Sequence, residues 1–136
     1  MNNKKSFILT NNEEEVMEIF WFQGRSLSRS EIIELSEGCS WKKSTIHILL
    51  NGLLEKGAIK VDGFVKTGKN YGRTFSANLT WAEYQIMQFN NGLNYNKSKS
   101  SAIEELVYGL VQDEDIDDET IERLEDILKK RKEDKK

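Results

Sequence analysis

Residues 40–57 limit the folds open to this chain more than any other stretch of its sequence. Their apolar residues recur at intervals of three and four positions, the spacing of a single apolar stripe along a helix. Ser40 stands where a helix N-cap is favoured, and Gly57 stands where a glycine commonly ends a helix. The sequence therefore predicts one helix of about four turns with both ends marked. Its apolar stripe would consist of Ile46, Leu49, Leu50, Leu53 and Leu54.

The opposite face of this expected helix is small and polar. At about 100° per residue, its side chains point away from the apolar stripe. Few charges lie on this face, so it could rest against a partner without repelling it. The residues of this face are Trp41, Ser44, Thr45, Ile48, Asn51 and Gly52.

Two shorter helices are expected before this stretch. A capping-box pattern at residues 10–13 predicts a helix over about 11–22, and a second pattern at 28–31 predicts a short helix over about 29–36. A short helix, a glycine-containing turn and a further capped helix are the parts of a helix-turn-helix.

A β-hairpin is expected directly after the long helix. Residues 58–62 alternate in polarity and are rich in β-branched side chains, and residues 64–67 continue the strand after a glycine that marks a bulge. Residues 68–72 have turn composition, and residues 73–77 have the composition of a returning strand. A hairpin in this position is the wing of a winged helix.

Residues 79–136 have the pattern of amphipathic helices but are too few to form a hydrophobic core of their own. A capping box at residues 80–83 opens one helix to about residue 89, and two more follow, the last capped by Asp117. Fewer than about 60 residues of such helix rarely form a stable core alone, so a second copy of the chain is the simplest partner. We expect a homodimer through Ile103, Leu106, Val107, Leu110, Val111, Ile121, Leu124, Ile127 and Leu128.

The expected fold class is mainly α with a small β-hairpin wing, a winged helix-turn-helix followed by a helical dimerisation region. Residues 1–78 would form a winged-helix DNA-binding domain, and residues 79–136 would form a helical dimerisation domain. Charge follows the same division, because residues 1–78 carry a net charge of +2 and residues 79–136 carry −5, which together give −3. The first half can therefore bind a polyanion while the second half stays clear of it.

Composition excludes several other classes of protein. The single cysteine, Cys39, rules out an internal disulfide and a cysteine-rich metal site. No apolar run is long enough to insert in a membrane, and the first residues lack the apolar core of a secretory signal, so we expect a cytoplasmic protein. His47 is the only histidine and has no partner placed by a motif for a metal or a nucleophile. We therefore expect no enzyme, no metal and no cofactor.

Several stretches of the chain together resemble the BlaI/MecI/CopY family of winged-helix repressors, the penicillinase repressors. The opening pattern from Leu9 to Trp21 is similar to the first helix of that family. Trp41, Thr45 and Ile46, followed by Lys56 and Gly57, resemble its recognition helix. The resemblance also includes Gly72, Arg73 and Phe75 at the end of the wing and the acidic step at residues 112–115.

The resemblance implies a homodimeric repressor of transcription that binds a palindromic double-stranded DNA operator. In one branch of the family, a membrane sensor protease signals and the repressor is cut at a position that corresponds here to Gly109 and Leu110. The family cuts between Asn and Phe, so this chain departs from that pattern. A copper-binding branch has cysteines near the C-terminus, and this chain has none there.

Both helical position and charge single out residues that would contact DNA. A recognition helix reads base edges in the major groove through its N-terminal residues, and Asn and Thr side chains can bond to them. Lysines and arginines near the helix and on the wing would contact phosphates, although a single surface lysine is more often simply solvated. The candidates are Trp41, Lys42, Lys43, Ser44, Thr45, Ile48, Asn51, Lys66, Lys69 and Arg73.

An alternative function is a winged-helix protein-interaction module whose DNA binding is reduced or lost. The family commonly carries basic residues on the recognition face, where this chain has Ser44, His47 and Gly52. The negative net charge also favours this alternative, whereas the basic wing favours DNA binding.

Overall fold

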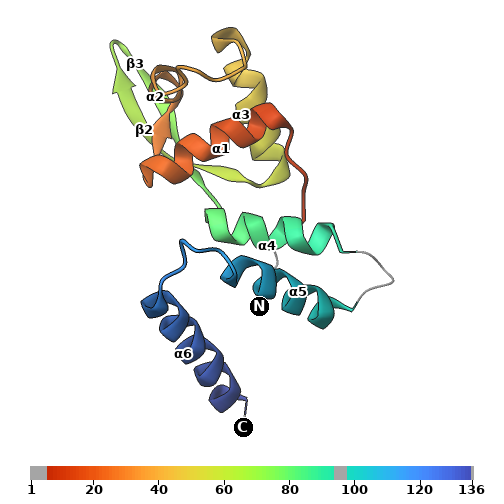
Figure 1. The fold of residues 1–136 in the computed structure, drawn as a ribbon. Coiled ribbons are helices and arrows are strands. Elements are labelled where there is room, and N and C mark those ends of the chain that lie inside the picture. The colour runs from red at the N-terminus through yellow and green to blue at the C-terminus, as the bar shows by residue number, and fades with distance from the viewer. Residues whose placement is uncertain (1–5, 94–97, 136) are drawn as a thin grey trace. The chain divides into compact units, whose positions relative to one another are not determined.

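A computed structural model describes residues 6–93 and 98–135 of the chain. The chain divides into two compact units, one ending at Gly92 and the next beginning at Leu93. Figure 1 shows the elements in order. They are α1 (Asn11–Gln23), β1 (Leu27–Ser28), α2 (Arg29–Glu34), the 3-10 helix η1 (Lys43–Thr45), α3 (Ile46–Lys56), β2 (Ile59–Thr67), β3 (Asn70–Ala77), α4 (Trp81–Asn91), α5 (Lys99–Val111) and α6 (Asp118–Asp134).

The helix starts predicted from capping boxes are confirmed. At α1, α2 and α4, the side chain of the N-cap residue accepts from the backbone of a glutamate three positions on, and that glutamate accepts from the N-cap backbone. These N-caps are Thr10, Ser28 and Thr80. The Asp117 carboxylate caps α6 by accepting from the Thr120 backbone N–H at 2.8 Å. Each cap satisfies backbone donors that a helix start leaves without a partner.

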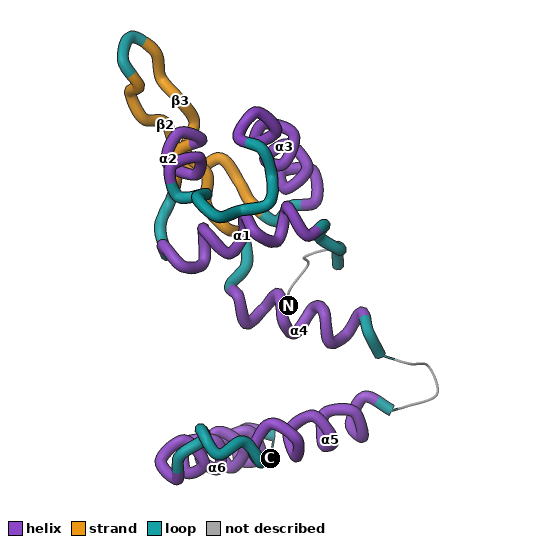
Figure 2. Tube along the Cα trace, turned by 45° about the horizontal axis from the view of Figure 1, so that its top comes forward, coloured by secondary structure: helices purple, strands orange, loops and turns teal. Residues whose placement is uncertain are grey.

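The predicted hairpin forms, and it belongs to a sheet with strand order β1-β3-β2, antiparallel throughout. The register shifts between Val61 and Gly63, which is the expected bulge. Pairing continues to Thr67 and Asn70, so the turn is shorter than the predicted 68–72. The two-residue strand β1 was not predicted. Figure 2 shows β2 and β3 as a hairpin whose tip projects beyond the neighbouring helices.

The core of the first unit lies between α1, α3 and the base of the sheet. The α3 stripe is confirmed, because Ile46, Leu49, Leu50 and Leu53 are all buried, and Leu54 packs against them. They pack with side chains from the other elements of the unit, since burial of apolar surface is the main stabilising term in such a core. These are Val16, Met17, Phe20, Leu27, Ile32, Ala58, Ile59, Phe75 and Leu79.

Helix α4 is tied to α1 by polar and aromatic contacts. The Trp21 indole N–H donates to the Leu79 carbonyl at 2.9 Å, and the Trp21 and Tyr84 ring centroids lie 5.4 Å apart. Tyr84 is 2% exposed, and its hydroxyl donates to Glu14 Oε2 at 2.8 Å. Consequently α4 belongs to the first compact unit, whereas the functional division expected after residue 78 would place it with the rear helices.

The predicted start of the long helix is wrong. Ser40 is not an N-cap: its hydroxyl donates to Glu15 Oε1 at 2.6 Å, and its backbone N–H donates to the same carboxylate. The 3-10 turn η1 comes first, and the α-helix begins only at Ile46. Glu15 of α1 therefore holds the loop before the helix, which leaves a helix shorter than expected. The end is as predicted, because Gly57 adopts φ 81° and its N–H donates to the last turn.

The second unit consists of α5 and α6. Among the described residues 98–135, no side chain in either helix is buried. The nine apolar residues expected to pair two subunits are all exposed or half-buried, with Ile103 at 42% and Leu128 at 65%. In the part of the chain that the structure describes, no helix is both long and apolar enough to cross a bilayer.

Candidate nucleic-acid interface

The outward face of α3 carries a small set of exposed side chains. Ser44 and Asn51 are exposed, and Ile48 is 61% exposed although it is apolar. Thr45 is half-buried, and its hydroxyl donates to the Lys42 carbonyl at 2.6 Å. Three of the four side chains therefore stand free to meet a ligand, while the Thr45 hydroxyl is already engaged.

Two residues predicted for this face point elsewhere. Trp41 is only 7% exposed and belongs to the core, because the helix has not yet begun at this position and the helical spacing does not apply. Its indole N–H is buried without a hydrogen-bond partner among the described residues, so it is not available to a base edge.

Gly52 is the second residue that the helical spacing misplaced. A Cβ built on it would lie 2.6 Å from Glu13 Oε2, so Gly52 faces α1 and not the outside. Glycine allows the two helices this close approach. Because Gly52 is not on the recognition face, it cannot have replaced a basic residue there. This removes Gly52 from the argument for a protein-interaction module.

A groove of about 460 Å³ runs between the start of α2, the side of α3 and the wing. From α3 it is lined by His47, Leu50 and Asn51, and from the wing by Asn70, Tyr71, Gly72, Arg73 and Phe75. Ser28, Arg29 and Ser30 line it at the start of α2. The groove brings Asn51 and Arg73, two of the predicted contacts, to one surface. No acidic side chain is among the described residues that line it, which suits a polyanion.

The wing adds a basic and aromatic face that continues from the groove. Arg73 is paired in register with Phe64, and Tyr71 with Lys66, so these four side chains share one face of the hairpin. The Arg73 guanidinium lies 5.2 Å from the centre of the buried Phe75 ring. This cation–π contact orients the arginine along the groove and leaves it exposed.

The acidic residue of the wing is held away from this face. Asp62 Oδ1 accepts from the Thr74 hydroxyl at 2.9 Å, and Oδ2 accepts from Ser26. Thr74 neighbours Arg73 on β3 and points to the opposite face. The Ser26 hydrogen bond, with that of Thr74, holds the pKa of the Asp62 carboxyl below its ordinary value. Asp62 therefore stays charged without facing the groove.

The remaining predicted cations are exposed but lie outside the groove lining. Lys42 and Lys43 stand just before α3, Lys66 lies on β2, and Lys69 occupies the wing turn. Their exposure is compatible with phosphate contact and equally with simple solvation, so these four stay predictions.

Sequence reasoning missed four groove residues. Arg29 and Ser30 follow the Ser28 cap, and the capping box could have placed both in the first turn of α2. His47 was singled out as the one histidine without a metal or catalytic partner; it is exposed, and it also lines the groove. Tyr71 was assigned to a turn, whereas it lies in β3 and is 71% exposed. The register of the hairpin, in which Tyr71 pairs with Lys66, places Tyr71 beside the groove.

No metal site accompanies this surface in the described ranges, where no three His, Cys, Asp or Glu side chains come together. The predicted cleavage position, Gly109 and Leu110, lies in the last turn of α5, and both residues are exposed. Backbone in a helix must open before it fits a protease, so exposure alone does not test this prediction.

Comparison with known proteins identifies relatives over nearly the whole chain. The penicillinase repressor of Bacillus licheniformis is 29% identical over 136 residues, covering 98% of both chains. The methicillin resistance regulatory protein MecI of Staphylococcus aureus is 26% identical over 130 residues, covering 95% of this chain and 99% of the relative. The solved DNA-binding domain of the repressor BlaI is 30% identical, covers 60% of this chain and 93% of that chain, and has a TM-score of 0.46.

A family model gives the assignment. The model described as "Penicillinase repressor" matches residues 9–130, which is most of the chain. The members of this family regulate transcription and are not enzymes, in agreement with the prediction from the sequence. With its winged helix and its exposed α3 face, the chain belongs to the penicillinase repressor family.

Proposed function

We propose that this chain is a homodimeric transcriptional repressor that reads a palindromic operator through α3 and grips the flanking phosphates with its wing. The observation that carries the proposal is the groove in which Asn51 of α3 and Arg73 of the wing line one surface free of acidic side chains. Base edges specify a sequence through residues such as Asn51, whereas cations such as Arg73 supply affinity and orientation.

The α3 face is better suited to contacting base edges than to contacting phosphates. Asn51 can bond in two places to an adenine edge, and Ile48 offers an apolar contact to a thymine methyl. Phosphate contacts would come from Arg73 and the lysines at 42, 43, 66 and 69. A repressor acts on the chromosome, so the proposal includes a cytoplasmic location.

The proposed pairing of subunits rests on the second unit. Its helices leave apolar side chains uncovered, including Leu110 at 59% and Ile127 at 63% exposure. A two-fold symmetric dimer would cover such stripes and would match the symmetry of a palindromic operator. Within this proposal, residues 1–78 bind DNA, residues 79–136 hold the dimer, and α4 joins the two. Cleavage at Gly109 and Leu110 by a membrane sensor protease stays a prediction about induction.

Titration of the DNA upstream of the chain's own gene tests the proposal. We expect tighter binding to one palindromic segment than to scrambled DNA, with affinity falling steeply as salt rises. Arg73→Ala should weaken binding to all DNA sequences alike and reduce the slope of log K against log salt by about 1. Arg25→Ala is the matched control, because Arg25 is an exposed arginine of the same unit outside the groove.

Two results would count against this function. An unchanged salt slope in Arg73→Ala would remove the wing from the contact. Equal, weak binding to every duplex would favour the protein-interaction module instead. The exposed aromatic rings of Phe64 and Tyr71, at 69% and 71%, are the observation that favours that alternative.

A further inference from the structure

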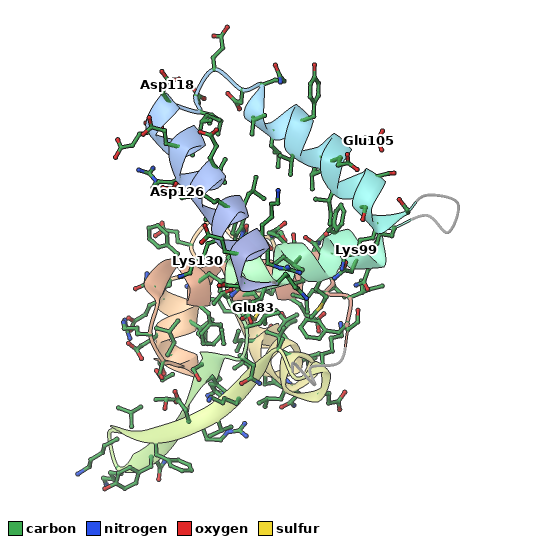
Figure 3. The ribbon with its side chains drawn as sticks, turned by 90° about the horizontal axis from the view of Figure 1, so that it is seen from below. Glu83, Lys99, Glu105, Asp118, Asp126 and Lys130 are labelled. Atoms are coloured by element: carbon green, nitrogen blue, oxygen red, sulfur yellow. The ribbon has the colours of Figure 1, made fainter. Side chains whose placement is uncertain are left out.

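The charges of α6 are unevenly distributed, although Arg123, Glu125 and Asp126 are mixed in its middle and Glu133 and Asp134 stand at its end. The segment 117–122 has only acidic charges, and the segment 129–132 has only basic ones. Figure 3 labels Asp118 and Lys130 near the two ends of this helix. The acidic residues are Asp117, Asp118, Glu119 and Glu122, and the basic residues are Lys129, Lys130, Arg131 and Lys132.

An uncovered apolar stripe lies between these two charged segments. Leu124 is 37% exposed, Ile127 is 63% and Leu128 is 65%, while Ile121 is half-buried. Because these residues recur at helical spacing, they line one side of α6 and would be covered by another helix laid along it.

The helix dipole explains only part of the charge pattern. Acidic groups at a helix start and basic groups at its end are favourable, but the effect falls off within one turn. The last turn of α6 holds Arg131 and Lys132, whereas Lys129 and Lys130 lie before it. Glu122 likewise lies beyond the first turn, which holds Asp118 and Glu119. The helix dipole therefore does not account for Glu122, Lys129 and Lys130, which lie outside the first and last turns.

We propose that α6 pairs with α6 of a second copy of the chain in antiparallel orientation, and that its charges select this orientation. The inference rests on the proposed homodimer. Antiparallel pairing lays the acidic segment 117–122 of each helix against the basic segment 129–132 of its partner, so these two segments attract. Parallel pairing would lay acid against acid and base against base, and like charges in contact are unfavourable.

Particular positions follow from the stripe. Residues 118 and 132 are two seven-residue repeats apart, so they lie along the same edge of the stripe, on either side of its centre. In an antiparallel pair, Asp118 of one copy therefore stands beside Lys132 of the other. In a parallel pair, the two copies of residue 118 would instead lie at the same level along the two helices, and so would the two copies of residue 132.

Cysteine cross-linking of the full chain tests the orientation. In a Cys39→Ser background, one preparation carries Asp118→Cys and another carries Lys132→Cys. Mixed under mild oxidation, the two should form disulfide-linked dimers that contain one copy of each. Asp118→Cys alone should form none. Cross-linking of Asp118→Cys with itself, or no cross-link in any mixture of chains that sediment as dimers, would overturn the proposal.

A charge exchange tests whether the charges select the partner. The exchanged chain carries Asp118→Lys, Glu119→Lys and Glu122→Lys together with Lys129→Glu, Lys130→Glu and Arg131→Glu. It is mixed with ¹⁵N-labelled wild-type chain for native mass spectrometry. Antiparallel pairing predicts two self-sorted homodimers, with mixed dimers well below the half that random exchange would give. Mixed dimers at or above half would overturn the proposal. A wild-type chain that sediments as a monomer would instead refute the homodimer itself.

Discussion

The ion pair between α1 and α3 allows a prediction whose sign depends on pH. Glu13 is 6% exposed, and one of its carboxylate oxygens accepts from both Lys56 Nζ and the Thr10 backbone N–H. Lys56 Nζ also donates to the Ile8 carbonyl at 2.8 Å. These hydrogen bonds connect the end of α3 to the start of α1 and thereby help to set the position of α3.

Lys56→Met keeps the length of the side chain and removes its charge. Breaking a fully buried pair by deleting one partner costs roughly 3–5 kcal/mol. The Lys56 side chain is 31% exposed, so water screens part of the interaction. We therefore expect a loss of about 2 kcal/mol in the free energy of unfolding at pH 7.

The pH dependence distinguishes this mechanism from simple loss of packing. Burial raises the pKa of Glu13, but the Lys56 hydrogen bond and the capping bonds outweigh it, so the pKa lies below its ordinary value of 4.5. A lowered pKa in the folded state means that the stability is present above pH 4.5 and is lost as pH falls through the folded value. Without Lys56, the hydrogen bond and the charge that lower the pKa of Glu13 are lost, so the pKa of Glu13 in the folded variant is higher than in the wild-type chain.

The cost of Lys56→Met should therefore shrink as the pH falls from 7 towards 4. Urea unfolding followed by tryptophan fluorescence measures this, with protein concentration held constant because the proposed dimer would contribute to stability. Lys60→Met is the control, since Lys60 is exposed. A cost that is the same at both pH values, or no larger than that of the control, would refute this account of the pair.

Four further substitutions test other parts of the structure. Gly52→Ala should lower the free energy of unfolding in urea by about 1–2 kcal/mol, because the new methyl group would collide with the hydrogen-bonded Glu13 carboxylate. Gly109→Ala is the control: a Cβ there has no atom within 4 Å, so the substitution should stabilise the helix by up to about 1 kcal/mol. Tyr84→Phe should cost about 1–2 kcal/mol at pH 7. Burial and then the bond to Glu14 raise the pKa of Tyr84, so the wild-type chain should lose stability as the pH rises above about 10 and the cost should shrink there; a constant cost would contradict this. Asn51→Ala should weaken operator binding by about 1–3 kcal/mol and leave binding to scrambled duplex and the salt slope unchanged, as measured by anisotropy titration.

Local sequence signals predicted the parts of the fold that depend on neighbouring residues. A capping box needs only residues four positions apart, and the three boxes at Thr10, Ser28 and Thr80 all form. The wing was predicted from alternation and turn composition, and its bulge stands at the expected glycine. These features follow from short-range chemistry that the sequence displays directly.

Errors occurred where a distant residue decides the structure. Ser40 has the composition of an N-cap, but Glu15 of α1 competes for its hydroxyl and backbone N–H. Trp41 then lies outside the regular helix and packs into the core. Helical spacing could not show that α1 lies against Gly52, because spacing describes one helix and not its neighbour. The groove residues Arg29 and Tyr71 come together only through tertiary folding.

The proposed division of labour makes dimer strength control operator affinity. One subunit alone would contact the phosphates of a single half-site, through Arg73 and the lysines at 42, 43, 66 and 69. Two subunits joined on one palindrome bind the second half-site at a high effective concentration, which multiplies the affinity without any new contact. Separation of the subunits would therefore release the operator even while α3 and the wing stay intact. Under this proposal, a signal that separates the subunits would act on the apolar stripes of α5 and α6.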